Sequence, residues 1–515
     1  MKYFQSFNDK KLKYCTKGRE KPIYGGPLPK KFGRIANFFI FMWMYKEPSF
    51  GEGFEDLREL IRQFENMQEG RSHSFLDEDS FELIIDYYDD QDDLAKALLA
   101  AELATEQFPF SALLMLKKAD LLIEAKRYDE ALELLEKADM FDPGDIFLYI
   151  LKTDAYLGLG RFADAYAMLE EGIRRFDGND RIELLLELAD VYDDWEEFDK
   201  VFDCFRLTLE YDPNNEEALH KICFWAEFTG RMEESIRLHN TIVNEYPFNE
   251  LAWFNLGSAF QELKLYEKSI DAYKYAIAIR DNFESAYRNM ADAYIRMKNY
   301  QAAIETLQRH QEIAKPDDVI FEAIGYCYEK QKKFDQARYH YRKAYHINPD
   351  DDRLYFRVGR TYMMEMQWSQ AVQYILSARK LNARSNEYCL ALGECYLQME
   401  SYKEALAQLL EAVKLRPASS RSRLHLIRAL YLAGYTEEAL SQLSAAAEET
   451  GDKPVYHYYR CAVLFRLGRP KEALLQLESG LAAAPRQLKR LIELNPSVLQ
   501  HSEVVDLLAR YHQKK

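Results

Sequence analysis

The residues of this chain best suited to recognition chemistry are amides and guanidinium groups. Asn255 and Asn289 stand at matching places in two similar stretches of the sequence. An amide side chain offers both a donor and an acceptor, which suits the backbone of a bound peptide whatever its sequence. Arg288 adjoins Asn289, and Arg357 and Arg360 follow in the sequence; guanidinium groups bind carboxylates through paired hydrogen bonds. These residue types favour binding rather than bond-making.

Groups that catalyse reactions do not form a recognisable constellation in the sequence. It contains no HExxH zinc motif, phosphate-binding loop, GxSxG elbow or kinase signature. The ten histidines are scattered, and the seven cysteines form no CxxC pair, so we interpret the cysteines as reduced packing residues. We therefore predict no enzyme activity, no cofactor and no metal site.

A 34-residue period organises the chain. The order of large and small residues in "AWFNLGSAFQELKLYEKSIDAYKYAIAI" (252–279) returns in "FEAIGYCYEKQKKFDQARYHYRKAYHINP" (321–349). Each unit carries the apolar spacing of a helix twice, separated by a polar turn, and a proline often closes it because its ring cannot continue a helix. Internal repetition of this length predicts a stacked helical array.

We number the places of each unit from the first residue of its first helix. Asp180 and Arg181 are an apparent insertion that lengthens one interval. The predicted units begin at Glu78, Ala112, Ile146, Ile182, Glu216, Glu250, Glu284, Asp318, Asp352, Asn386, Ser420 and Pro454. The eighth place of several first helices is glycine, as at Gly257 and Gly325, which predicts close approach of the second helix. Large residues such as Tyr273 and Tyr341 are expected to fill the space between neighbouring units.

This pattern resembles the tetratricopeptide repeat family, in which W-x2-L-G-x2-Y, a later A-x3-F-x2-A and a closing proline mark each helix pair. The match is clearest in "WFNLGSAF" (253–260), "YFRVGRTY" (355–362) and "CLALGECY" (389–396). The resemblance implies an all-α fold, a right-handed α-solenoid of antiparallel helix pairs. We predict twelve repeats over residues 78–487.

The two ends of the chain lack the repeat. Residues 1–53 are predicted to be a poorly ordered leader that is basic, with eleven Lys or Arg and two acidic residues through Lys46. Its apolar run "IANFFIFMWMY" (35–45) resembles part of a signal or anchor but is too short to span a membrane. Residues 54–77 are predicted to form an N-terminal capping helix, and residues 488–515 the C-terminal capping helices.

The family resemblance also implies which residues face a binding groove. In such arrays the first helix of each pair lines the concave surface, through its second, fifth, sixth, ninth and thirteenth places. This implies an acidic N-terminal part that includes Glu183, Glu187 and Asp190. It implies a later polar and basic part with Asn255, Arg288, Asn289, Arg296, Arg353, Arg357, Arg360, Arg421 and Arg428. The alternative is that these are ordinary solvated charges.

Asn255 and Asn289 are similar to the asparagine ladder with which some members of the family hold a peptide backbone. The arginines resemble a carboxylate clamp without matching it, because the expected lysine is absent. We therefore expect a protein or peptide partner that is acidic or ends in a free carboxylate.

Two functions remain open at the level of the sequence. The first is a non-catalytic, cytoplasmic and monomeric adaptor for protein–protein interaction. The alternative is a structural subunit of a self-assembling, secretion or cell-envelope complex. The net charge of −17 disfavours nucleic-acid binding, and no segment predicts a membrane span. Light scattering at several concentrations separates the two functions, because a monomer favours the adaptor.

Overall fold

The computed structural model describes residues 53–68, 75–315 and 317–513. Every regular element in these ranges is helical: 27 α-helices and two short 3₁₀ helices, η1 and η2. The predicted leader, apart from Gly53, lies outside the described residues, as does its apolar run 35–45. None of the described helices is long and apolar enough to cross a membrane.

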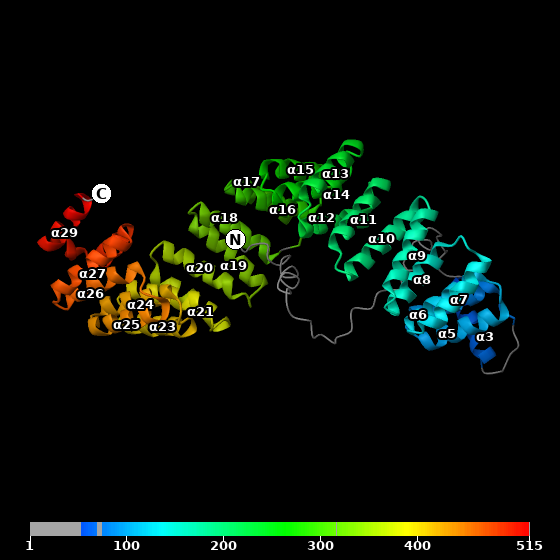
Figure 1. Ribbon diagram of the computed structural model, residues 1–515, viewed down its shortest axis with the longest axis horizontal. Helices are drawn as coiled ribbons and strands as arrows, with labels where there is room; N and C mark the ends of the chain where they lie inside the picture. Colours follow the sequence, from blue (N-terminus) through cyan, green and yellow to red (C-terminus); the bar gives the residue numbers. More distant parts are fainter. Residues whose placement is uncertain (1–52, 69–74, 316, 514–515) are drawn as a thin grey trace. The chain divides into compact units, whose positions relative to one another are not determined.

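The described helices form two compact units, the first of which ends at Asp281. Successive helices in it pack as antiparallel pairs (Figure 1). Its helices are α3 (Gly53–Gln68), α4 (Glu78–Asp90), α5 (Leu94–Gln107), α6 (Ala112–Glu124), α7 (Tyr128–Phe141), α8 (Ile146–Gly158), α9 (Phe162–Arg175), α10 (Asn179–Asp194), α11 (Phe198–Tyr211), α12 (Glu216–Thr229), α13 (Met232–Glu245), α14 (Glu250–Glu262) and α15 (Tyr266–Ile279).

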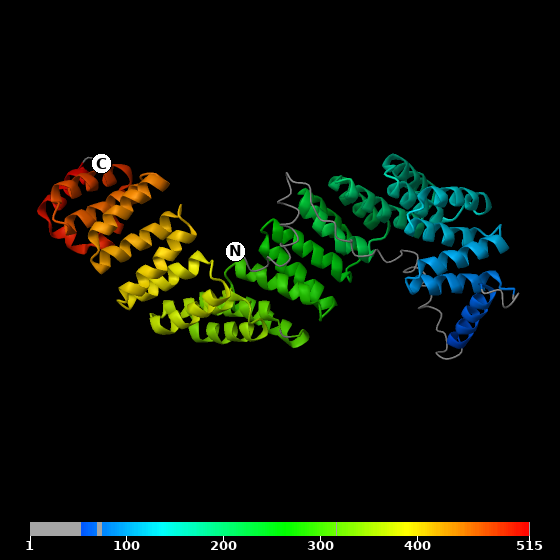
Figure 2. The same ribbon diagram turned by 90° about the horizontal axis from the view of Figure 1, so that it is seen from below.

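The second unit begins at Asn282, and its pairs stack one against the next (Figure 2). Its helices are α16 (Glu284–Arg296), α17 (Tyr300–Ile313), α18 (Asp318–Lys330), α19 (Phe334–Ile347), α20 (Asp352–Met364), α21 (Trp368–Leu381), α22 (Asn386–Gln398), α23 (Tyr402–Leu415), α24 (Ser420–Ala433), α25 (Thr436–Thr450), α26 (Pro454–Arg466), α27 (Pro470–Ala483), η1 (Pro485–Gln487), α28 (Leu488–Leu494), η2 (Pro496–Gln500) and α29 (Ser502–Gln513).

The first helices begin where the 34-residue period places them, with one exception. α10 begins at Asn179 rather than at Ile182. The two additional residues lengthen its first turn, and Arg181 Nε donates to the carbonyl oxygens of Ile173 and Phe176 at 3.0 and 2.9 Å. The prediction for this start was wrong because the extra residues continue the helix instead of extending the preceding loop.

The turn within each helix pair repeats one backbone conformation. The residue at the fifteenth place of each predicted repeat lies in this turn and has a left-handed φ, between 57° and 89°, in every pair from α4/α5 to α26/α27. In the turn after α6, the Arg127 N–H donates to Leu122 O at 2.8 Å and closes the helix end. These positions are Asp92, Lys126, Gly160, Glu196, Gly230, Lys264, Lys298, Lys332, Met366, Glu400, Gly434 and Gly468. Most of these residues are not glycine. The hydrogen bonds at the helix end therefore hold a left-handed conformation that residues with a Cβ atom disfavour.

The predicted close contact at the eighth place is confirmed. A Cβ added to Gly325 would lie 2.7 Å from the Tyr341 ring, and one added to Gly257 would lie 2.6 Å from Tyr273. Both tyrosines are fully buried. They pack on the glycine of their own pair, which the sequence analysis did not anticipate, and Tyr341 also packs with Val358 of the next pair.

Further helices lie beyond the repeated pairs at both ends. Phe64 of α3 is fully buried with Phe81 and Ile84 of α4. At the other end α28 packs on α26, and α29 packs on α27. The predicted boundaries of the capping segments, 54–77 and 488–515, remain our interpretation.

Candidate functional site

Asn255 does not present its amide to a ligand. Its side chain is 3% exposed, and Nδ2 lies 2.6 Å from Leu219 O and 3.3 Å from Nε2 of His239. His239 Nδ1 in turn lies 2.7 Å from Ser235 O, so Nδ1 donates and Nε2 accepts. Burial lowers the pKa of His239 to about 4, which keeps the ring neutral. The amide ties α14 to α12 and α13, and its predicted role in holding a peptide backbone was wrong.

Asn289 and Arg288 lie on α16, in the unit that begins at Asn282. Asn289 is half-buried. The Arg288 guanidinium is held by Asp317, 2.6 Å from Nη2, and its Nε lies 3.2 Å from His310 Nε2. Because the amide of Asn255 is buried and hydrogen-bonded within its own unit, it cannot act with Asn289 as a ladder for a peptide backbone.

The arginines of α20 are paired with carboxylates of α18. Arg357 Nε lies 2.5 Å from Glu322 Oε1, and both side chains are largely buried. Arg360 Nη2 lies 2.7 Å from Glu329 Oε1, while the Tyr341 hydroxyl donates to Glu329 Oε2 at 2.9 Å. Burial raises the pKa of Glu322 to about 7, so its ionisation depends on nearby positive charge. These arginines join the helix pair α20/α21 to the preceding pair α18/α19 through ion pairs.

Three further predicted arginines also have acidic neighbours. Arg296 contacts Asp292 at 2.5 Å, and Arg353 contacts Asp351 at 2.7 Å. Arg428 Nη1 lies 2.8 Å from Glu394 Oε2. The predicted basic surface is therefore largely neutralised by carboxylates interleaved with the arginines. Arg421 differs, because it is exposed and makes no ion pair within the described residues.

The acidic part of the prediction lies on α10 in the first unit. Glu183, Glu187 and Asp190 are all half-buried. Burial, reinforced by Asp180, raises the pKa of Glu183. Asp190 Oδ1 lies 3.9 Å from Lys221 Nζ. Carboxylates outnumber cations among these neighbours.

A cavity of about 740 Å³, which we call the C-terminal cavity, lies among α24, α26 and residues 487–494. Arg421, Arg428, Lys489 and Arg490 line it, against the single carboxylate of Glu493. The other lining residues are His425, Gln487, Leu424, Val455, Tyr459 and Leu494. This chemistry suits an anionic ligand that also carries apolar groups.

Two polar atoms in that lining have no hydrogen-bond partner among the described residues. They are Gln487 Oε1 and His425 Nδ1, and both are buried. Burial lowers the pKa of His425 in spite of Glu394, whose Oε2 lies 3.8 Å from Nδ1. A buried acceptor without a donor is costly, and the N–H of a ligand backbone would satisfy Gln487.

A second cavity of about 440 Å³, the basic turn cavity, lies where the turns before α22 and α24 meet. Arg384, Arg416 and Arg421 line it, together with Glu387 and the hydroxyl-bearing Ser385 and Ser419. Asn382, Asn386 and Leu390 complete the lining. Arg421 is thus shared with the C-terminal cavity.

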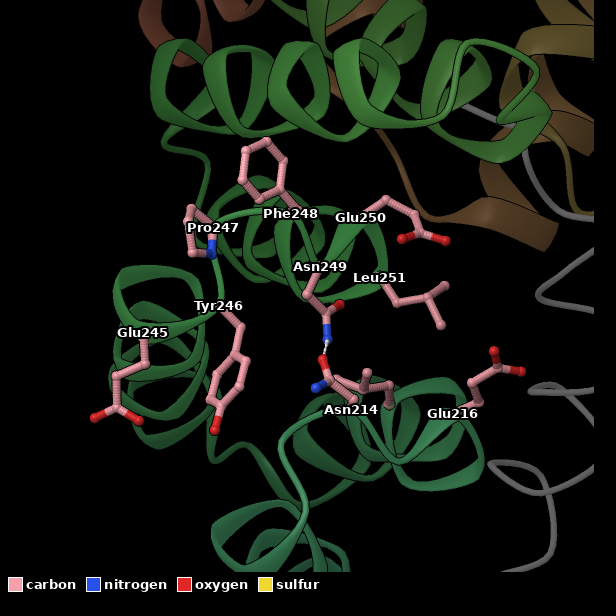
Figure 3. A pocket seen from close by; sticks show the side chains of 10 residues that line it. Asn214, Glu216, Glu245, Tyr246, Pro247, Phe248, Asn249, Glu250 and Leu251 are labelled. Carbon is pink, nitrogen blue, oxygen red and sulfur yellow. Dashed lines mark hydrogen bonds between the residues drawn. The ribbon is translucent and has the colours of Figure 1, made fainter.

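The first unit has a cavity in the same place of the repeat but with different chemistry (Figure 3). This acidic turn cavity, about 460 Å³, is lined by Glu216, Glu245 and Glu250. Asn249 Nδ2 donates to Asn214 Oδ1 at 2.9 Å and joins its two turns. Its other lining residues are Leu219, Tyr246, Pro247, Phe248 and Leu251, of which Phe248 is 82% exposed.

Comparison with known families matches residues 83–146, 359–420 and 390–454 to one family described as tetratricopeptide repeat, and residues 122–189 to another of the same description. Residues 232–378 match the C-terminal ARM domain of tetratricopeptide repeat protein 21. This chain is a tetratricopeptide repeat protein. Such repeats generally mediate protein–protein interactions and are typically non-catalytic.

Solved structures similar to this tetratricopeptide repeat protein share limited sequence identity. Cut9 with Hcn1, of the APC/C, covers 81% of this chain and 97% of its own at 14% identity and a TM-score of 0.33. The C-terminal part of a repeat protein from Cytophaga hutchinsonii covers 47% and 99% at 18% identity and a TM-score of 0.41. YrrB, described as having an unusual peptide-binding site, covers 36% and 96% at 16% identity and a TM-score of 0.32. No curated protein sequence matches the chain significantly.

The sequence analysis missed several cavity residues of this repeat protein. Lys489 and Arg490 were assigned to the C-terminal cap and Gln487 to the last repeat, and none of them to a binding surface. The available signal was the period itself, because α28 begins at Leu488, one full period after α26 begins at Pro454. α28 therefore stands where the first helix of a further pair would stand and lines the cavity in the same way.

Burial disfavours the reactive thiolate form of most cysteines in the described residues of the tetratricopeptide repeat protein. The six cysteines in the described residues are free, and five are buried. Burial raises the pKa of Cys204, Cys327, Cys395 and Cys461 to about 12. No group of three or more histidine, cysteine or acidic side chains suited to a metal ion occurs in the part of the chain that the structure describes.

Proposed function

We propose that this protein is a non-catalytic adaptor that binds an acidic protein segment, or one ending in a free carboxylate, in the C-terminal cavity. The observation that carries the proposal is the charge of the cavity lining. Arg421, Arg428, Lys489 and Arg490 face one carboxylate, Glu493, in a chain whose net charge is −17. A local positive surface on an acidic protein attracts anionic partners and repels cationic ones.

Two of these cations are already paired, and two are not. Arg428 contacts Glu394 at 2.8 Å, and Arg490 contacts Glu493 at 3.1 Å. Arg421 and Lys489 have no ion pair within the described ranges and are exposed. They provide the charge that a ligand carboxylate would meet first, and Arg421 can bind it through two hydrogen bonds.

The rest of the lining suits a peptide rather than a simple anion. Leu424, Val455 and Leu494 offer apolar contact for a side chain. Gln487 Oε1, buried without a donor, accepts a backbone N–H. This assigns to Gln487 the amide role that the sequence analysis gave to Asn255.

The test uses the full chain and two synthetic peptide libraries, both with degenerate apolar positions before a final aspartate or glutamate. One library ends in a free carboxylate, and the other ends in an amide. We expect the free-carboxylate library to bind more tightly by about tenfold, which corresponds to roughly one charge-assisted hydrogen bond. Isothermal titration at low and moderate salt measures the difference.

A double variant locates the binding. Lys489→Gln with Arg490→Gln should remove most of the preference for the free carboxylate. The matched control is Arg309→Gln with Arg510→Gln, which removes the same charge from exposed positions outside the cavity lining. Equal binding of both libraries by the wild-type protein, or an unchanged preference in the cavity variant, would contradict the proposal.

A further inference from the structure

We infer that the basic turn cavity is a binding site for a phosphoryl group, carried by a phosphorylated serine or threonine of the bound segment. The inference rests on the proposed function in one respect, since Arg421 lines both this cavity and the C-terminal cavity. A segment in the C-terminal cavity can therefore extend past Arg421 into the basic turn cavity. The argument for a phosphoryl group is independent of that extension.

Three guanidinium groups without acidic partners surround this cavity. Arg384 comes from the turn before α22, Arg416 from the turn before α24, and Arg421 from the first turn of α24. All three are exposed and none makes an ion pair within the described residues. Most other arginines that the sequence analysis assigned to a groove are paired, Arg288 with Asp317 and Arg360 with Glu329 among them. Three positive charges close together, without an ion pair in the described ranges to balance them, indicate that the cavity binds an anionic ligand.

The single carboxylate in the lining does not compensate this charge. Glu387 lies on the first turn of α22 and interacts electrostatically with Arg357 and Arg360 of the preceding pair. Its negative charge is therefore shared with two cations that do not line the cavity. The positive charge of Arg384, Arg416 and Arg421 remains in excess.

The arginines are not needed to build the turns. The acidic turn cavity occupies the same places of the repeat, five repeats earlier in the chain. Five lining positions correspond, and they pair Asn214 with Arg384, Glu216 with Asn386, Tyr246 with Arg416, Asn249 with Ser419, and Leu251 with Arg421. The same turn forms with asparagine, tyrosine and leucine at the three arginine positions, so the arginines are available for binding.

The number of donors favours a phosphoryl group over a carboxylate. Each guanidinium carries several N–H donors in a planar fork. Ser385, the residue before α22, makes no side-chain cap hydrogen bond, so the first N–H groups of that helix add further donors directed at the same turn. A carboxylate has two oxygens and one charge. A phosphoserine has three terminal oxygens and a charge near −2, which better satisfies three arginines.

The experiment combines a small anion and peptides on the full chain. The peptide libraries share degenerate positions and a free acidic terminus, and differ only in a fixed serine, glutamate or phosphoserine upstream. Inorganic phosphate is titrated separately, with chloride at matched ionic strength as the control. We expect the phosphoserine library to bind about tenfold or more tightly than the serine library, with the glutamate library between them.

The variant Arg384→Gln with Arg416→Gln should abolish the phosphoserine preference and phosphate binding while leaving the serine library bound as before. The control is again Arg309→Gln with Arg510→Gln. Circular dichroism checks that each variant is folded, and both altered arginines are exposed. Arg384→Lys with Arg416→Lys should retain part of the affinity, since lysine keeps the charge but loses the paired hydrogen bonds.

The outcomes separate this inference from the proposed function. Binding of the serine library without phosphoserine preference or phosphate binding overturns the inference and leaves the proposed function standing. Phosphate binding that depends on Arg384 and Arg416, without binding of any library, supports the phosphoryl site and contradicts the proposed function. A single-stranded oligonucleotide that competes with phosphate and binds more tightly than every library overturns the assignment to a phosphorylated protein segment. Binding of nothing contradicts both proposals.

Discussion

The face of α18 and α20 and the surface around α22, α24 and α28 both carry arginines at places that the repeat assigns to its concave side. On the first, Arg357 and Arg360 contact the largely buried carboxylates of Glu322 and Glu329. On the second, Arg421 is exposed and without an acidic partner in the described ranges, and so is Arg384 of the neighbouring turn before α22. The same residue type thus joins neighbouring helix pairs in one region and is available to a ligand in the other.

The largest expected effect is a loss of folding stability when an ion pair between α18 and α20 is removed. Arg357→Gln leaves Glu322 largely buried without its guanidinium, and loss of one member of a buried ion pair costs about 3–5 kcal/mol. Hydrogen exchange in α18 and α20, together with thermal unfolding, measures the loss. Arg421→Gln is the matched change in the second region and should alter the free energy of unfolding by less than about 0.5 kcal/mol. Equal destabilisation by the two variants would refute the distinction between paired and unpaired arginines.

A smaller effect on stability is expected from a half-buried acidic residue of the first unit, Asp120. Burial, and then the neighbouring Asp89 and Asp154, raise the pKa of Asp120 to about 7. Lys117 lowers it, but its Nζ is also 2.5 Å from Asp86. The folded state therefore binds this proton more tightly than the unfolded state, whose aspartate titrates near 3.8. The contribution of this carboxyl group to stability should therefore fall as the pH rises from about 4 through 7.

The variant Asp120→Asn tests the predicted direction of this pH dependence. The variant should raise the unfolding temperature at pH 8, where the wild-type carboxylate is ionised, and should change it little at pH 4. The control is Asp281→Asn, at an exposed position of the turn between α15 and α16. A wild-type protein that is more stable than Asp120→Asn at pH 8 would show that the carboxylate is stabilised rather than strained.

The sequence was sufficient to predict the helices because each helix pair is specified locally. Eleven of the twelve first helices begin at the predicted residue, and the second helix approaches Gly325 closely, as predicted, although the contact with Tyr341 itself was not anticipated. The exception, α10, arose because an insertion next to a helix can extend either the helix or the loop. Local rules do not distinguish those two outcomes.

The candidate site was less predictable because its chemistry depends on neighbours in other repeats. Reading each place of the repeat on its own identified Arg360 but not its pairing with Glu329, which lies in the preceding helix pair. Asn255 was misassigned for the same reason, since Leu219 O comes from the first helix of the preceding pair. Opposite charges separated by about one repeat, such as Glu322 and Arg357, were the signal that would have indicated the pairing.

The central claim is that unpaired cations around Arg421 bind the partner, and the most direct test is a titration of Arg421→Leu. Leucine is the residue at the corresponding position of the acidic turn cavity, Leu251, so the turn should keep its fold. Because Arg421 lines both basic cavities, the free-carboxylate and phosphoserine libraries should each bind the variant about tenfold more weakly than the wild-type protein. Wild-type affinity of the Arg421→Leu variant for both libraries, at low and moderate salt, would contradict the account.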